Sequence, residues 1–421
     1  MRSVAPASDQ APEDTEADRA LNRKDIFLIC FCVAAGLVDG YDSQVIAFAA
    51  PYMQEELTLS SSILGWVFSA GLIGGMFGAV PAAHLEMKFG RRAVLMLCLF
   101  WISIGSIITS LISTGPVLVV IRFFAGIGLG MAMPLLFGAM MDSVPRKVRA
   151  RSLSLVMCAI PAGGLCGGLL SATISSQYGW RPLFWIGCVL PILLLPSLFA
   201  AIPRERRPAA ADAPVSETAQ EKAEGGVIRS LLKAGGIAFA IIFVTNIFSA
   251  GLGYILMSWT PTLLVYTGFS KATAALSGGL LMGGAMVAFL ILGFLVDRLG
   301  PFKVAIPAYA GAALSILCLG VLSGDQTTTM VLCFLAGFFG VGSQVTITYI
   351  VGDLVPTQYR VAAFGTAMIS SRIGAGIGPL SIGFMSSAGL TPMALFAVMA
   401  VLGLIGSVGV FLSNRARREA Q

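Results

Sequence analysis

The sequence is poor in charge, in histidine and in paired cysteines. Only 11% of its 421 residues are charged, against about 25% in soluble domains, while 57% are hydrophobic. No water-soluble fold of this size buries so much apolar surface, so the composition predicts a membrane protein. There is one His, and the eight Cys include no Cys-x-x-Cys pair. We therefore expect neither disulfides nor a metal site.

Other absences limit the function. No glycine-rich phosphate loop of the P-loop type occurs, which argues against ATP-driven transport, and nothing in the sequence supports an enzyme or a bound cofactor. Residues 1–24 are polar and mixed in charge, unlike a signal peptide. The driving force that remains available is a proton gradient.

The chain instead contains twelve apolar runs of about twenty residues or more, long enough to cross roughly 30 Å of hydrocarbon as helices. The runs are continuous rather than alternating, which excludes a barrel. The predicted spans are residues 25–50, 62–84, 93–113, 116–140, 152–176, 181–202, 236–258, 272–296, 303–322, 328–351, 362–386 and 391–412.

Basic residues predict the orientation. With both termini in the cytoplasm, all but four of the 27 Lys and Arg fall in the tails, the inner loops or the linker. This bias satisfies the positive-inside rule and explains the net charge of +6 without a nucleic-acid partner. The four exceptions are Arg122, Arg181, Lys271 and Arg372.

An internal repeat divides the chain into two halves. The pattern Asp-x-x-Pro-x-x-x-Arg occurs at residues 142–149 and again at 353–360, an offset of 211, and the loops at 85–90 and 295–300 match at an offset of 210. Two matching loops at nearly one offset predict two six-helix halves of the same topology, with a substrate site between them near the membrane midplane.

The predicted organisation follows from the repeat and from the one long polar segment, whose composition suits a flexible linker. It comprises a cytoplasmic tail (1–24), a first six-helix half (25–202), a cytoplasmic linker (203–235), a second six-helix half (236–412) and a second cytoplasmic tail (413–421).

These loops resemble the major facilitator superfamily, whose signature after the second span is Gly-x-Leu-Ala-Asp-Arg-x-Gly-Arg-Arg. Residues 83–92 read Ala-His-Leu-Glu-Met-Lys-Phe-Gly-Arg-Arg, with Met87 in place of Asp; the second copy, residues 293–300, keeps the acid as Asp297. In the family this Asp helps to latch the halves together, so Met87 brings that latch of the first half into question. Glu86 is adjacent, but on a helix it points about 100° away.

A narrower resemblance is carried by Asp39-Gly40-Tyr41-Asp42 in the first span and by residues 371–379 in the eleventh. Both stretches are similar to the aromatic acid:proton symporters of that superfamily. The resemblance implies import of a small organic acid anion with protons across a bacterial-type inner membrane, by a protein that usually works as a monomer. Benzoate, a hydroxybenzoate, muconate or a lactone acid would all suit.

Asp39 and Asp42 stand three residues apart, so they share one face of the first span. They lie roughly 21–26 Å into the span at helical rise. Two acids this close in a low dielectric do not both ionise easily, which suits a proton carrier. The alternative is a structural pair held by hydrogen bonds or a cation.

Two arginines are candidates for the substrate anion. Arg372 lies near the middle of the eleventh span without an obvious acidic partner, and its planar fork matches a carboxylate. Arg122 lies roughly 9 Å inside the fourth span, with Gly126 and Gly130 on its stripe. Either Arg122 binds substrate or it pairs with Asp42. Arg372 could also be a structural arginine satisfied by backbone carbonyls.

Polar and aromatic side chains of other spans are candidates for the rest of the binding site, because a flat apolar anion requires aromatic walls and one fixed cation. Ordinary packing is the competing interpretation for each. The candidates are Gln44, Asn246, Tyr254, Gln344 and Tyr349.

Charged residues of the repeated loops lie at helix ends, so we expect them to form gating salt bridges rather than substrate contacts. They are Asp142, Arg149, Asp353 and Arg360, with Arg91, Arg92, Asp297 and Arg298 of the signature loops.

Two other functions remain open. One is a proton-coupled exporter of drugs or metabolites, although the Gly-Pro signature of such exporters is replaced by Ile160-Pro161 in the fifth span. The other is a membrane sensor that binds a ligand without transporting it, although the chain has no sizeable soluble output domain.

Overall fold

The structure is a computed structural model that describes residues 21–202, 217–322 and 324–419, with the backbone only at 217–235, 357 and 361. Residues 1–20 of the predicted N-terminal tail and residues 203–216 of the predicted linker lie outside the described residues. The described chain is almost entirely helical and contains no strand. The predicted fold class, all-α with two six-helix halves, is confirmed.

The first half contains six helical segments, of which the fifth includes a π-helical turn. They are α2 (Arg23–Glu56), α3 (Ser61–Phe89), α4 (Arg91–Leu111), α5 (Gly115–Ser143), α6 (Arg146–Leu170) continued by η1 (Ser171–Ser175) and α7 (Ser176–Tyr178), and α8 (Arg181–Ala201).

The second half repeats this order, and its fourth segment contains the second π-helical turn. The elements are α9 (Glu217–Tyr266), α10 (Lys271–Leu299), α11 (Pro301–Leu322), α12 (Gln326–Ala336), η2 (Gly337–Val341), α13 (Gln344–Asp353), η3 (Thr357–Tyr359), α14 (Arg360–Ser387) and α15 (Pro392–Glu419).

Each predicted span lies on one helical segment and extends beyond it by at most two residues, although several helices are longer than the predicted spans. Eleven of the described segments are long and apolar enough to cross a membrane. The twelfth, α14, is long enough but carries Arg372 and many Gly and Ser. Within the predicted linker, the backbone of 217–235 is helical, and Gly236, with φ 57°, separates this part of α9 from the span.

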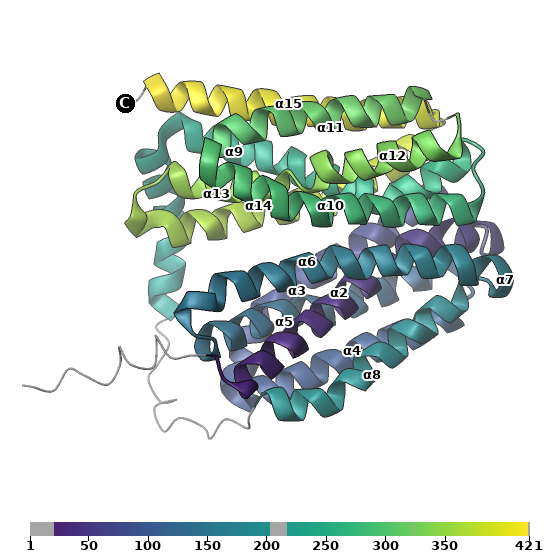
Figure 1. Cartoon of the computed structure of the whole chain (residues 1–421), viewed down its shortest axis with the longest axis horizontal. Helices are drawn as coiled ribbons and strands as arrows, with labels where there is room; N and C mark the ends of the chain where they lie inside the picture. The colour runs from purple at the N-terminus through teal and green to yellow at the C-terminus, as the bar shows by residue number, and fades with distance from the viewer. Residues whose placement is uncertain (1–20, 203–216, 323, 420–421) are drawn as a thin grey trace, which may run out of the picture.

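Figure 1 shows the two halves one above the other, with α2–α8 below and α9–α15 above. They meet where α3 packs on α14, α6 on α10 and α2 on α9. Because successive helices run in opposite directions, the loops rich in Lys and Arg all lie at the end where α2 begins and α15 ends. We call this the basic end and the opposite one the far end.

Glycines allow α3 and α5 to pack with their backbones in contact. A Cβ at Gly74 would lie 2.0 Å from the carbonyl oxygen of Phe123, and one at Gly126 would lie 2.0 Å from that of Gly71. Small residues permit such close helix packing in membranes. The stripe that the sequence places beside Arg122 therefore faces α3, and Arg122 points into the protein.

Polar contacts between the halves cluster at the far end. Gln54 Nε2 donates to Tyr266 Oη at 2.6 Å, and the hydroxyls of Ser61 and Tyr266 lie 3.1 Å apart. Glu55 forms an ion pair with Lys271. We call these contacts, with those of Ser62 to Ser387 and Ser61 to Ser386, the far-end seal.

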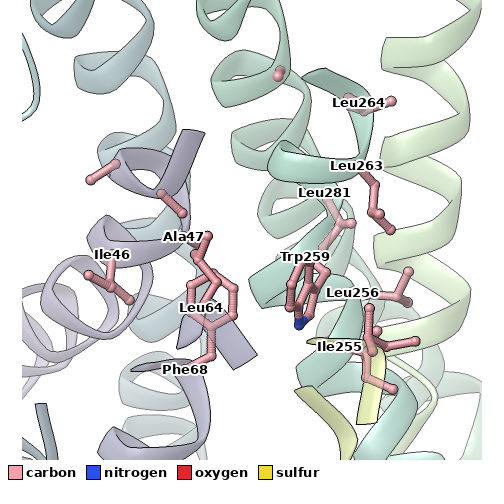
Figure 2. Packing of buried hydrophobic residues seen from close by; sticks show 14 of the residues in the cluster. Ile46, Ala47, Leu64, Phe68, Ile255, Leu256, Trp259, Leu263, Leu264 and Leu281 are labelled. Atoms are coloured by element: carbon pink, nitrogen blue, oxygen red, sulfur yellow. The ribbon is translucent and has the colours of Figure 1, made fainter. Parts of the chain in front are cut away.

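An apolar plug lies next to the seal. Figure 2 shows Leu64 and Phe68 of α3 facing Trp259 of α9, and the rings of Phe68 and Trp259 meet edge to face at 5.5 Å. Gly65 packs on Gly383 at the same end. The halves are thus closely joined on this side of the membrane.

At the basic end, the ion pairs of Arg91 and Arg417 stay within one half. Arg91 pairs with Glu86 and Asp142 at 2.5 and 2.8 Å, all within the first half, and Arg417 pairs with Asp353 within the second. Among the side chains that the structure describes, and leaving Asp25 and Lys147 aside, no ion pair joins the two halves at this end. The structure therefore represents a state closed at the far end.

Candidate functional site

The two acids of α2 have different partners. Asp42 is 2% exposed and accepts a hydrogen bond of 2.6 Å from Ser106 Oγ of α4, inside the first half. Asp39 is half-buried and interacts electrostatically with Asp42 and with Arg372 of the second half. The predicted pair is therefore close together, but only Asp39 is close to the second half's arginine.

Arg122 lies beside Asp42, as the sequence predicts, but without an ion pair between the two side chains. The guanidinium is 6% exposed, and its Nη2 lies 3.5 Å from the backbone oxygen of Asp42. Its Nε and Nη1 have no partner among the described residues. A buried cation with two unused donors favours an anion at this position.

Arg372 lies in α14 where that helix packs on both halves. Two residues later, a Cβ at Gly374 would lie 2.0 Å from the carbonyl oxygen of Ile247 in α9, and Gly376 contacts Ile73 of α3. Arg372 is half-buried and makes no hydrogen bond or ion pair within the described part of the chain. Its guanidinium is thus available to a ligand.

Asn246 and Gln344 bind each other instead of standing free. Gln344 Nε2 donates to Asn246 Oδ1 at 2.7 Å, and Ser249 Oγ donates to Gln344 Oε1 at 2.9 Å. Asn246 Nδ2 donates to Ser370 Oγ and to the carbonyl oxygen of Ala367, both at 2.8 Å. We call Asn246, Ser249, Gln344 and Ser370 the amide network; it joins α9, α13 and α14.

The other predicted binding residues differ in burial. Gln44 is buried near Gly164 and Met282, where two halves meet, and its Oε1 has no partner among the described residues. Tyr254 is half-buried, whereas Tyr349 is 42% exposed. Of these, Gln44 alone combines burial with an unused polar atom.

The predicted gating residues all lie at the basic end, and their partners differ. Arg149 Nε donates to the carbonyl oxygen of Val144 at 3.1 Å rather than to an acid. Arg92 stacks on the ring of Phe199, with its Cζ 4.1 Å from the ring centroid. The remaining gating residues, Asp297, Arg298 and Arg360, are exposed. Their role in gating stays a prediction.

An apolar groove of about 580 Å³ runs between α9 and α15. Ile237, Val244 and Val408 are among its lining residues, and no charged side chain lines it. It contains none of the predicted site residues, so it is a surface feature distinct from the candidate site.

The sequence did not reveal Ser106, the contact between Asn246 and Gln344, or the far-end seal. Ser106 is one of several Ser and Thr in an apolar span, and nothing in its spacing distinguishes it. A signal for the seal did exist: Lys271 is one of the four basic residues outside the basic end.

The fold and the site define an α-helical membrane transporter with ionisable groups between two similar halves. The family profile of the Major Facilitator Superfamily matches residues 32–379 and 242–421. The chain therefore belongs to the major facilitator superfamily, and it is a multi-pass membrane protein rather than an enzyme.

Relatives of known function match nearly the whole chain. The 3-(3-hydroxy-phenyl)propionate transporter of Escherichia coli K12 is 30% identical over 93% of this chain and 94% of its own length. The gallate transporter of Pseudomonas putida is 29% identical over 94% and 92%. The 4-hydroxybenzoate transporter PcaK of Pseudomonas aeruginosa is 28% identical over 90% and 91%. The predicted resemblance to the aromatic acid:proton symporters is confirmed.

Solved structures share the fold. A D-xylose-proton symporter aligns with a TM-score of 0.77 at 19% identity, over 92% of this chain and 97% of that one. A bacterial homologue of the human lysosomal transporter Spinster, inward-facing and unoccupied, aligns with a TM-score of 0.73 at 19% identity, over 95% and 99%.

Proposed function

We propose that this protein imports a small aromatic carboxylate together with protons, as a monomer in a bacterial-type inner membrane. The basic end then faces the cytoplasm with both termini, in accord with the positive-inside rule. The relatives that carry hydroxyphenylpropionate, gallate and hydroxybenzoate support this substrate class.

The observation that carries the proposal is Arg372. It is a half-buried guanidinium near the middle of a helix at the interface between the halves, without a hydrogen bond or ion pair to a described residue. A charge inside the membrane is costly unless it is paired or hydrated. A carboxylate matches the two-point geometry of the guanidinium. Asp39 is the acid that interacts electrostatically with Arg372.

Protons enter the cycle through Asp39 and Asp42. From the outside, protonation neutralises this pair and releases Arg372 from the field of Asp39. The substrate carboxylate then binds Arg372, with Arg122 close by. When these charges are balanced, the halves rock about the site and open towards the cytoplasm, where the substrate and the proton leave.

Uptake into proteoliposomes tests the proposal. A panel of labelled aromatic and aliphatic acids is offered with and without an inward proton gradient. We expect gradient-dependent uptake of aromatic acids, abolished by Arg372→Gln and preserved by Arg418→Gln, an exposed arginine near the end of α15.

The coupling role has its own variant. Asp42→Asn should abolish uptake that is driven by the proton gradient. If the variant still accumulates substrate in response to an acid exterior, Asp42 does not couple protons to transport. If the wild-type protein takes up no aromatic acid from the panel, the proposed substrate class is wrong.

A further inference from the structure

The hydrogen bonds of the amide network have a fixed direction. The carbonyl oxygen of Ala367 can only accept, and it receives bonds from both Asn246 Nδ2 and Ser370 Oγ. Because Ser370 Oγ donates its one proton to Ala367, it can only accept a hydrogen bond from Asn246. Asn246 therefore has to turn its amide nitrogen towards α14 and its Oδ1 towards α13.

This direction passes on to Gln344. Asn246 Oδ1 requires a donor, so Gln344 must direct its Nε2 towards it. The Oε1 of Gln344 then accepts the hydrogen bond from Ser249 Oγ. The Nε2 amide carries two protons, and Asn246 uses one of them. Gln344 is thus left with one N–H in a defined orientation, and no acceptor for it is present among the described residues.

The free N–H is the accessible part of an otherwise buried network. Asn246, Ser249 and Ser370 are at most 2% exposed, whereas Gln344 is half-buried. An amide N–H without a partner costs roughly 1–3 kcal/mol when it is removed from water. It must therefore face water or a ligand rather than lipid, and its bond to Asn246 places Gln344 against α9, a helix that also packs on α2 of the first half.

The backbone around Gln344 also has the character of a binding site. The span is interrupted by the π-helical turn η2 and by two turn residues immediately before Gln344. Interrupted helices at the midplane and π-turns are frequent at transporter and other functional sites. Gln344 lies nine residues from the basic end of α13 and Arg372 twelve from that of α14, roughly 14 and 18 Å at helical rise. The two donors are therefore within about one helical turn of the same depth.

We propose that Gln344 is the residue that selects ring-hydroxylated substrates: its free N–H donates to a hydroxyl oxygen on the aromatic ring, while Arg372 holds the carboxylate. The inference rests on the proposed function and narrows its substrate class. A site built to hydrogen-bond one substrate group discriminates strongly against an analogue without that group.

The test compares labelled 4-hydroxybenzoate with benzoate, which differ by the ring hydroxyl alone. Uptake of both is measured in proteoliposomes for the wild-type protein, Gln344→Leu and Gln344→Met. We expect the wild-type protein to prefer 4-hydroxybenzoate. Both variants should raise the KM for 4-hydroxybenzoate roughly tenfold or more and leave that for benzoate within about twofold, so the preference disappears.

Ser370→Ala is the matched control. It removes the bond that Ser370 accepts from Asn246 and the bond that it donates to Ala367, but leaves the free N–H of Gln344 in place. It should therefore preserve the preference for 4-hydroxybenzoate, even if uptake of both acids falls. Melting temperature of the detergent-solubilised protein identifies any variant that fails to fold, and Gln344→Met retains the side-chain length that Leu shortens.

Three outcomes overturn parts of the reasoning separately. Equal losses for both acids in the Gln344 variants would mean that this N–H serves the carboxylate or the fold, and the inference about the ring hydroxyl would be wrong. An unchanged preference would overturn it as well. A wild-type protein that carries neither acid would refute the proposed function itself.

Discussion

Tyr266→Phe should open the far end of the protein. The hydroxyl of Tyr266 bonds to Gln54 and to Ser61, so this single oxygen joins α9 of one half to α2 and α3 of the other. Both contacts are exposed, so each contributes about 0.5–1 kcal/mol, the lower part of the usual range. Their loss together, about 1–2 kcal/mol, should shift the equilibrium roughly 5- to 30-fold towards the state that is open at the far end.

Distances between two spin labels measure that shift. Exposed residues Ser113 and Gln326 lie at the far ends of the two halves and tolerate labels there. In Tyr266→Phe we expect a longer distance to become populated. Tyr178→Phe is the control, since Tyr178 is 72% exposed at the same end and lies in one half only.

If Tyr266→Phe and Tyr178→Phe give the same distance distribution as the wild-type protein, the seal contributes nothing to the balance between states. The ion pair of Glu55 and Lys271 offers an independent check, because exchanging the two residues keeps the attraction, whereas either single charge reversal turns it into repulsion.

Three further predictions concern single positions. Ser106→Ala removes the hydrogen bond to Asp42 and should slow proton-driven uptake roughly fivefold or more, whereas Ser103→Ala, one turn away on α4 and bonded to its own helix, should not. Gly74→Ala should lower the melting temperature by overpacking of about 1–3 kcal/mol, while Gly75→Ala, whose Cβ has 3.6 Å of room, should be tolerated; equal melting would refute the packing argument. At the far end, burial alone would raise the pKa of Glu56, but hydrogen bonds from Arg181 and Trp180 outweigh it and the pKa is lowered. Stability from Glu56 is therefore fully present above pH 4.5 and is lost as the pH falls through the lowered pKa of the folded protein, so Glu56→Gln should melt earlier than the wild-type protein at pH 6, and the difference should shrink as the pH is lowered below 4.5.

The fold could be predicted because the membrane restricts the solutions so strongly. Continuous apolar runs can only be helices there, and the repeated loops give the symmetry. The same restriction made the buried charges visible: Asp39, Asp42, Arg122 and Arg372 stand out because each is costly in lipid.

The sequence does not predict the orientation of each polar side chain or the partner that it contacts. Asn246 and Gln344 were predicted to face the substrate, but their contact depends on the register of α9 against α13, which no spacing within one helix records. Glu86 shows the same limit. Gly90, with φ 81°, turns the chain so that Arg91 pairs with Glu86, a contact that the spacing along the helix does not indicate.

The far-end seal also determines how the transporter senses its surroundings. In the proposed orientation the far end faces outward, so molecules closed at that end offer no binding site to external substrate, and the apparent affinity equals the intrinsic affinity reduced by the fraction that is open. A mutation at Tyr266 or Lys271 can therefore change the external substrate concentration that uptake requires, without altering any residue that contacts the substrate.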